Sequence, residues 1–232
     1  MGQRDDLIEY FDLPTGKVTA GITLKGKDLR DSCEAFNYLS EVFSVRREKI
    51  FLMSQVHGPV IRELSAPSEG NPAGNLLSGT DGMLFTGDPA GCLLGVRVAD
   101  CMPVIILHKD DLLGMFHAGW RGISSGIGSE SVRMIESKGL LLKDITYIAG
   151  PYICGDCFRI GAEVAERLPA AACRGSFADL FEALSIQLME KGVNSASIIP
   201  AKEDGECTFE NMKYYSHRKG DSERMVAFAI QR

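Results

Sequence analysis

The chain has 232 residues, of which 45% are hydrophobic and 24% are charged. These proportions are ordinary for a globular protein with a sizeable core, so they exclude collagen-like, coiled-coil and disordered chains. Asp and Glu (31) outnumber Lys and Arg (25), and the resulting net charge of -6 has the wrong sign for general binding to the phosphate backbone of nucleic acids.

Short apolar or alternating runs predict strands, and apolar residues at helical spacing predict helices. In chain order, the expected elements are a strand at 17–23, a helix at 31–43, strands at 50–56, 59–64, 82–86, 93–98, 103–108 and 112–117, a helix at 122–138, a strand at 145–149, helices at 160–168 and 176–191, and strands at 196–200 and 224–230. The strands between 50 and 118 lack the regular alternation with helices of a doubly wound sheet. We therefore expect an α+β fold with a mixed or antiparallel sheet.

One connection between these elements is unusually long. Residues 65–81 are rich in Gly, Pro, Ser and Asn, and we expect a disordered segment or a plain surface loop there, with a functional loop as the alternative. No linker or repeat divides the chain, so we expect residues 1–232 to form a single domain.

Three features predict a cytoplasmic protein without a membrane partner. No apolar run approaches the roughly 20 residues that span a bilayer, and residues 1–10 lack the pattern of a secretory or transit signal. The seven cysteines are odd in number and irregularly spaced, which fits a reducing compartment better than a disulfide framework. The sequence makes no prediction of the oligomeric state.

The histidine count limits the metal chemistry. The chain has four histidines, His57, His108, His117 and His217. A multicopper oxidase draws on about ten imidazoles for its blue-copper and trinuclear sites, so four exclude that class.

Three segments carry candidate metal ligands at the ends of apolar strands: residues 54–58, 98–104 and 116–122. Strand ends at one edge of a sheet converge in space, so His57, Cys101 and His117 are placed to meet. Two imidazoles and one thiolate are a plausible zinc set that leaves a fourth position for water, as in catalytic zinc sites. The alternative is that Cys101 is an inert buried thiol and each histidine a satisfied polar group.

Several motifs accompany these segments. They are Gln-Val-His-Gly at 55–58, Thr-Asp-Gly-Met-Leu-Phe-Thr at 80–86, Ala-Asp-Cys-Met-Pro-Val at 99–104, His-Ala-Gly-Trp-Arg-Gly at 117–122, Gly-Pro-Tyr-Ile at 150–153, Cys-Thr at 207–208 and Tyr-Ser-His-Arg-Lys at 215–219. Together they resemble the laccase-domain family of zinc-dependent purine nucleoside phosphorylases, also called the polyphenol oxidase-like or peptidoglycan editing factor family. The resemblance spans about residues 50 to 232.

The resemblance implies a fold, a metal and an activity. It implies a single-domain, layered α/β/β/α sandwich, and zinc, in preference to copper, bound by His57, Cys101 and His117. It implies phosphorolysis of adenosine, inosine, guanosine and methylthioadenosine, with adenosine deamination alongside. Some bacterial members are instead linked to hydrolysis of wrongly installed L-serine from a UDP-muramic-acid precursor of peptidoglycan, which is the alternative activity.

Two further residues have possible catalytic roles. Asp100 is the nearest candidate for the proton shuttle that deamination needs, provided that the strand breaks there; the alternative is a structural cap or salt bridge. Arg121, together with the glycines and serines of 119–126, is a candidate phosphate site at a helix N-terminus. The alternative there is a tight turn in which Trp120 and Arg121 only pack.

Other features receive structural interpretations. Cys154 and Cys157 form a lone Cys-x-x-Cys, which we interpret as a structural or incidental thiol pair. His108 and His217 match no ligand position of the family.

Two departures from the family pattern concern the substrate. Residues 18–27 lack the arginine that the family carries in its N-terminal segment, and Arg159 stands where an acidic residue is common. The missing arginine weakens the inference of phosphorolysis, whereas the zinc ligands are unaffected. Two other hypotheses remain: a metal-free hydrolase with Cys101 as nucleophile and His117 as base, and a metal-binding module without catalysis.

Overall fold

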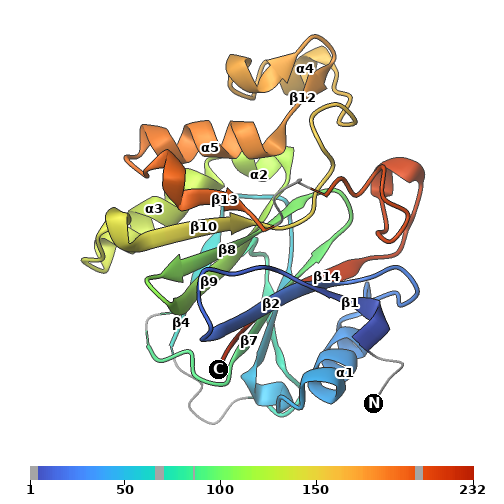
Figure 1. The fold of residues 1–232 in the computed structure, drawn as a ribbon, viewed down its shortest axis with the longest axis vertical. Helices are drawn as coiled ribbons and strands as arrows, with labels where there is room; N and C mark the ends of the chain where they lie inside the picture. Colours follow the sequence, from blue (N-terminus) through green and yellow to red (C-terminus); the bar gives the residue numbers. More distant parts are fainter. Residues whose placement is uncertain (1–4, 66–70, 86, 202–205) are drawn as a thin grey trace.

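The computed structural model describes residues 5–65, 71–85, 87–201 and 206–232. Two six-stranded sheets pack face to face, and helices cover the outer face of each sheet, so the molecule has four layers (Figure 1). Each sheet contains both parallel and antiparallel pairs. The expected α/β/β/α sandwich with mixed sheets is therefore confirmed.

The first sheet lies against a single long helix. Its strand order is β1 (Ile8–Tyr10), β2 (Val18–Thr23), β14 (Met225–Gln231), β7 (Leu93–Val98), β3 (Ile50–Ser54) and β5 (Asn75–Ser78). Helix α1 (Ser32–Phe43) begins where the carboxylate of Asp31 accepts a hydrogen bond from the backbone N–H of Glu34. Phe36 and Leu39 of this helix are buried against the outer face of the sheet.

The second sheet lies under three helices, of which the second and third in chain order are the longer two. Its strand order is β13 (Ile198–Pro200), β10 (Ile145–Ala149), β8 (Met102–His108), β9 (Asp111–Ala118), β6 (Gly82–Phe85) and β4 (Ile61–Leu64). Its outer face is covered by α2 (Trp120–Ser124), α3 (Ile127–Ser137) and α5 (Leu180–Glu190). Helix α4 (Ala162–Ala165) and the hairpin of β11 (Cys173–Arg174) and β12 (Phe177–Ala178) lie beyond α5 (Figure 1). Single 3-10 turns lie at Asp5–Leu7, Arg47–Lys49, Leu142–Asp144, Ala170–Ala172, Ser195–Ser197 and His217–Lys219.

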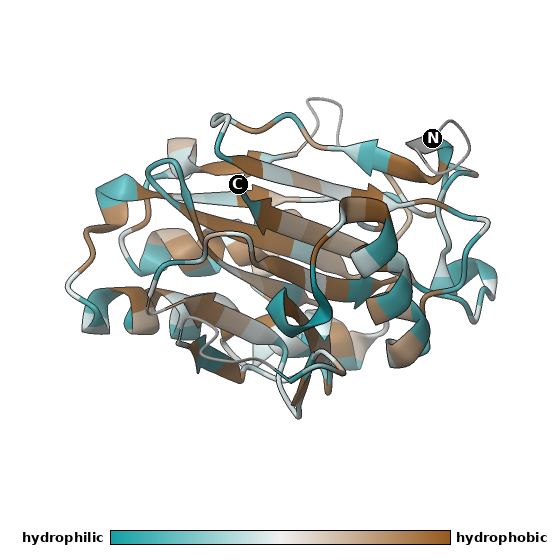
Figure 2. Cartoon of the chain, turned by 90° about the horizontal axis from the view of Figure 1, so that it is seen from below, coloured by the Kyte–Doolittle hydropathy of each residue, from teal (hydrophilic) through white to brown (hydrophobic). Residues whose placement is uncertain are grey.

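The central strands are buried on both faces. In β8, Ile105 and Leu107 face the other sheet, whereas Val104 and Ile106 face the helices, and all four are at most 1% exposed. Successive side chains point to opposite faces of a strand, and here both faces are buried. The sequence of such a strand is therefore an unbroken apolar run. Figure 2 shows these strands as mostly hydrophobic, with hydrophilic residues concentrated on helices and loops. Among the described residues, no helix combines the length and the apolar character needed to cross a membrane.

The structure differs from the predicted elements in a few places. The long connection 65–81 contains strand β5, which pairs in parallel with β3, while residues 66–70 lie outside the described residues. The helix expected at 122–138 is two helices, because Gly126 at φ 92° breaks it. The helix expected at 160–168 is reduced to α4, and the one expected at 176–191 begins only at Leu180 because β12 precedes it.

Candidate metal centre

His57, Cys101 and His117 come together at the seam between the two sheets. His57 follows β3 of the first sheet, His117 lies near the end of β9 of the second sheet, and Cys101 lies in the short crossing from β7 to β8. Their ligand atoms all lie within 4.8 Å of one another. The structure therefore brings together the three side chains that the sequence placed at strand ends.

A buried carboxylate, that of Asp81, holds the turn that carries His57. It accepts hydrogen bonds from the backbone N–H groups of Val56, His57 and Gly58 at 2.9–3.0 Å. His57 has a φ of 61°, a left-handed conformation that is uncommon for a residue with a side chain. The three hydrogen bonds to Asp81 stabilise this conformation and so hold the backbone from which the His57 side chain extends.

The same carboxylate orients the second histidine. Asp81 Oδ1 lies 3.0 Å from Nδ1 of His117, and both side chains are almost fully buried. A carboxylate that accepts from one ring nitrogen leaves the other nitrogen free to bind a metal and makes it a better ligand. Sequence reasoning missed Asp81, although it stands directly before a predicted strand inside one of the motifs.

Gly119 leaves room for the three donor side chains. A Cβ at this position would lie 2.9 Å from Sγ of Cys101, 3.6 Å from Cδ2 of His57 and 3.7 Å from Cε1 of His117. The φ of Gly119 is -87°, so space rather than backbone conformation favours glycine here. A side chain at position 119 would press on the donors from one side.

Electrostatics favour the ionised thiol. Burial opposes ionisation of Cys101, but the charge of His117 and hydrogen bonds from His117 and His57 outweigh it and lower the Cys101 pKa to about 6. Burial likewise opposes protonation of His117, yet the Cys101 thiolate and Asp81 raise its pKa to about 9. A thiolate and two imidazoles are the ligands that zinc prefers, and copper accepts the same types. The donor set thus fits a metal with an open fourth position.

These donors line a cavity of about 490 Å³. Three arginines, Arg30, Arg97 and Arg224, also line it, and so does His217. Sequence reasoning gave none of these four a role, because they come from distant segments and no motif unites them. The cavity therefore combines a metal-binding set with a concentration of positive charge in a chain whose net charge is -6.

Asp100 neighbours Cys101 but its carboxylate is engaged elsewhere. Its Oδ1 accepts from Oγ1 of Thr208 and its Oδ2 accepts from the backbone N–H of Arg218, both at 2.7 Å. The residue has a φ of 82°, so the strand does break at this point. These contacts correspond to the structural role considered for Asp100, and its role as a proton shuttle stays a prediction.

Arg121 and His108 lie away from the cavity lining. Arg121 is exposed, and its guanidinium carbon lies 4.3 Å from the ring centre of Trp120, a cation–π contact. The helix that follows Gly119 has only five residues. His108 lies at the opposite end of β8 from Cys101. The predicted phosphate site at 119–126 therefore stays a prediction to which this geometry adds no support.

A family model, sequence relatives and a solved structure all match most of this chain. The family described as "Multi-copper polyphenol oxidoreductase laccase" matches residues 24–232. Purine nucleoside phosphorylase YlmD of Geobacillus stearothermophilus is 30% identical over 89% of this chain and 81% of its own length. Adenosine deaminase RL5 of an unknown prokaryotic organism is 30% identical over 56% of this chain and 53% of its own. The crystal structure of YlmD from Geobacillus stearothermophilus superposes with a TM-score of 0.81 at 28% identity, covering 95% of this chain and 94% of that one.

Proposed function

The chain belongs to the multi-copper polyphenol oxidoreductase laccase family. Because a relative that matches 89% of this chain is named a purine nucleoside phosphorylase, we propose that this chain is a zinc-dependent purine nucleoside phosphorylase. The proposed substrates are adenosine, inosine, guanosine and methylthioadenosine, with adenosine deamination as a second activity. The observation that carries this proposal is the convergence of His57, Cys101 and His117 in a cavity that three arginines also line.

The protein's own residues supply the metal set. His57, Cys101 and His117 would hold the zinc, and Asp81 supports two of them through hydrogen bonds to the backbone N–H of His57 and to the ring of His117. A zinc bound with an open position supplies a Lewis acid and a water whose pKa falls to about 7, which suits deamination. The four histidines of the chain argue against the copper chemistry that the family description names.

The arginines of the cavity are the proposed phosphate site, in place of Arg121. Arg97 is held by hydrogen bonds from its guanidinium to the carbonyls of Arg30 and Met53. Arg224 is held through Nη1, which donates to backbone carbonyls of its own turn. Guanidinium groups fixed in this way are suited to binding a phosphate dianion through charge-assisted hydrogen bonds.

His217 is the proposed proton donor for the leaving purine. In phosphorolysis a phosphate oxygen forms a bond to C1′ of the ribose while the bond from C1′ to the purine nitrogen breaks. The base leaves with the electron pair of that bond and requires a proton. His217 lines the cavity and lies outside the metal set, which supports this role.

The test is a product assay with purified, zinc-loaded protein. Incubation with adenosine and phosphate should give adenine and ribose 1-phosphate, and deamination should add inosine and hypoxanthine. Cys101→Ser should abolish product formation, whereas Cys33→Ser, at an exposed position on α1, should not. Absence of all products from zinc-loaded wild-type protein would contradict the nucleoside proposal.

Two alternatives use the same cavity. An arginine-lined cavity also suits the diphosphate of a nucleotide-linked precursor, so the second candidate is a zinc amidohydrolase that removes L-serine from a UDP-muramic-acid precursor. The pairing of Cys101 with His117 favours a third candidate, a metal-free hydrolase in which the thiolate is the nucleophile. Activity of the zinc-loaded protein on the serine-bearing precursor identifies the second, and activity that survives complete zinc removal identifies the third.

The state of the cysteines supports a reducing compartment. All seven are free thiols. Cys101 binds a metal only as an unoxidised thiolate, because disulfide formation would consume the ligand. We therefore place the enzyme in the cytoplasm.

A further inference from the structure

A second group of metal-ligand side chains lies outside the cavity. It consists of Cys154, Cys157, Cys207 and Glu210, whose ligand atoms all lie within 4.8 Å of one another. The sequence indicated only a lone Cys-x-x-Cys, which is weak evidence for a metal. The structure adds a third sulfur and a carboxylate from a segment about fifty residues further along the chain.

A tight turn aims the first two sulfurs to one side. The backbone N–H of Cys157 and the N–H of Phe158 both donate to the carbonyl of Cys154, at 3.0 and 2.9 Å. The chain therefore curls back within the Cys-x-x-Cys unit. This spacing is typical of zinc sites in which one turn supplies two thiolates.

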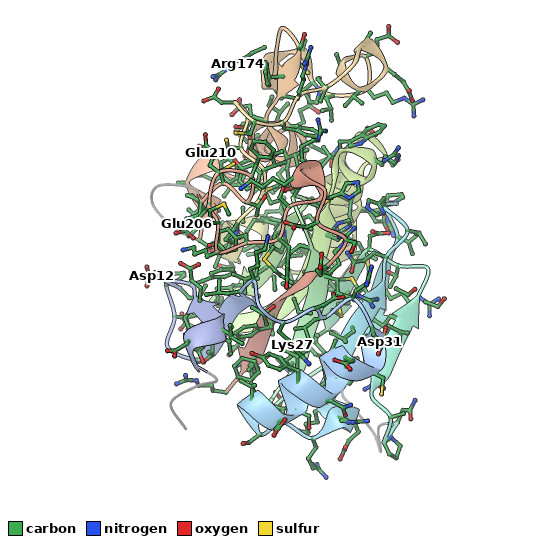
Figure 3. The ribbon with its side chains drawn as sticks, turned by 90° about the vertical axis from the view of Figure 1, so that its right-hand side faces the viewer. Asp12, Lys27, Asp31, Arg174, Glu206 and Glu210 are labelled. Atoms are coloured by element: carbon green, nitrogen blue, oxygen red, sulfur yellow. The ribbon has the colours of Figure 1, made fainter. Side chains whose placement is uncertain are left out.

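A second segment supplies the other two ligands. Cys207 forms an isolated parallel bridge with Tyr152, and the N–H of Thr208 donates to the carbonyl of Tyr152 at 3.0 Å. The N–H of Asn211 donates to the carbonyl of Cys207, also at 3.0 Å, which closes a turn. Glu210 is exposed and lies on the flank of the molecule (Figure 3). A cation from solvent therefore has access to the group.

A backbone hydrogen bond to Cys207 favours the thiolate form of its sulfur. The backbone N–H of Cys154 donates to Sγ of Cys207 at 3.3 Å. Amide groups that donate to a thiolate orient it and favour its ionised form, as supporting contacts do around metal ligands. This hydrogen bond also joins the two segments at the point where a metal would bridge them.

We propose that Cys154, Cys157, Cys207 and Glu210 bind a structural zinc ion, separate from the one held by His57, Cys101 and His117. Three sulfurs and one carboxylate complete a tetrahedron, and a closed set of four protein ligands is the mark of a structural site. Sulfurs about 2.3 Å from a tetrahedral zinc lie roughly 3.8 Å apart, so shifts of roughly 1 Å bring the present atoms into coordination. The inference does not depend on the proposed activity.

The second site is connected to the first through hydrogen bonds to Asp100. Thr208, next to Cys207, donates to the carboxylate of Asp100, and the N–H of Ile153, next to Cys154, donates to the Asp100 carbonyl at 3.0 Å. The two segments that the zinc would join thus both hold the residue that precedes Cys101. Zinc at the second site therefore stabilises the backbone that carries a ligand of the first.

Zinc stoichiometry separates the two sites. Wild-type protein expressed with zinc and freed of loosely bound metal should retain about two zinc ions per chain, because each ligand set holds one. The double variant Cys101→Ser/His117→Ala should retain about one, and so should Cys154→Ser/Cys157→Ser. Cys33→Ser, which removes an exposed cysteine on α1, should keep both ions. One ion in the wild type and none in Cys101→Ser/His117→Ala would overturn the proposal.

Two further measurements use protein with the second site intact. In Cys101→Ser/His117→Ala, cobalt should give an intense thiolate-to-cobalt charge-transfer band, and the further change Glu210→Gln should shift the position of that band.

In wild-type protein stripped of metal, added zinc should protect Cys154, Cys157 and Cys207 from alkylation, as read by peptide mass spectrometry. Absence of the band, absence of protection, or a disulfide among these cysteines in protein purified without oxygen would contradict the zinc site. Because none of these readouts is an activity, their failure is distinguishable from failure of the proposed function.

Discussion

At the residue scale, Asp81 links two of the three donors of the metal centre. It accepts three backbone N–H groups around His57 and one ring N–H of His117. Burial opposes its ionisation, but these hydrogen bonds outweigh burial and lower the Asp81 pKa. The side chain is therefore a fixed anion that positions ligands without binding the metal.

Asp81→Asn tests this positioning role. Asparagine keeps the shape of the side chain but replaces one acceptor oxygen by an N–H donor, which faces backbone N–H groups. We expect zinc affinity to fall about 10- to 100-fold, the usual effect of removing a supporting carboxylate. A competition titration with a chromophoric chelator measures it. Asp12→Asn, at an exposed aspartate (Figure 3), should leave affinity unchanged, and equal affinity in both variants would contradict the role.

The Cys101 thiol gives a pH-dependent prediction. Its pKa of about 6 lies below the ordinary cysteine value of about 8.5, and only the thiolate reacts with an alkylating agent. In protein stripped of metal, alkylation of Cys101 should therefore be half-maximal near pH 6 and should slow as the pH falls below it. His117→Ala should move the midpoint upward, because the main stabilising charge is removed. A wild-type midpoint above pH 8 would contradict the thiolate and imidazolium pair.

At the element scale, the strands bring the site together because each donor lies at or beyond a strand end. Such strands were predictable from the sequence, since burial on both faces turns them into unbroken apolar runs. The break at Gly126 was not, because Ile123 and Ile127 pack in the same core and the apolar spacing continues across it. Strand β5 was missed because it has only four residues, none of them buried, and its partner β3 lies more than twenty residues earlier in the chain.

The same limit applies to the site. His57, Cys101 and His117 were recognisable from their motifs and strand ends, and the structure brings them together. Asp81, His217 and the cavity arginines reach the site from distant segments, and only the packed sheets bring them there. Sequence spacing does not show which distant segments meet, so the roles proposed for these residues could be argued only from the fold.

Gly119→Ala tests the turn between β9 and α2. The added Cβ would lie 2.9 Å from Sγ of Cys101, closer than ordinary contacts permit, so the donor set must shift. We expect zinc affinity to fall at least tenfold, because the displaced ligands can no longer reach one ion together. Overpacking should also lower the free energy of unfolding by about 1–3 kcal/mol. Gly161→Ala, whose Cβ would meet no atom within 4 Å, is the matched control. Unchanged zinc affinity in Gly119→Ala would contradict the tight fit.

At the scale of the whole molecule, the candidate metal ligands come from both sheets. His57 is attached to the first sheet, His117 belongs to the second, and Cys101 lies where the chain crosses between them. Away from the site, the sheets are held together by a shared apolar core that includes Val96, Ile105 and Met115, all fully buried. An ion bound to all three donors would therefore act as a cross-link at one end of that interface.

Thermal unfolding measures this cross-link. A ligand at 100 times its dissociation constant stabilises the native state by about 2.7 kcal/mol. For a chain of this size, about 1 kcal/mol shifts the Tm by about 2–4 °C, so the cross-link should contribute about 5–10 °C. In calorimetry of metal-stripped protein, zinc should raise the Tm of the wild type by that much more than it raises the Tm of Cys101→Ser. The variant retains the second group of cysteines, so the difference isolates the ion between the sheets. Equal zinc-induced shifts in the two proteins would show that no stabilising ion joins the sheets at Cys101.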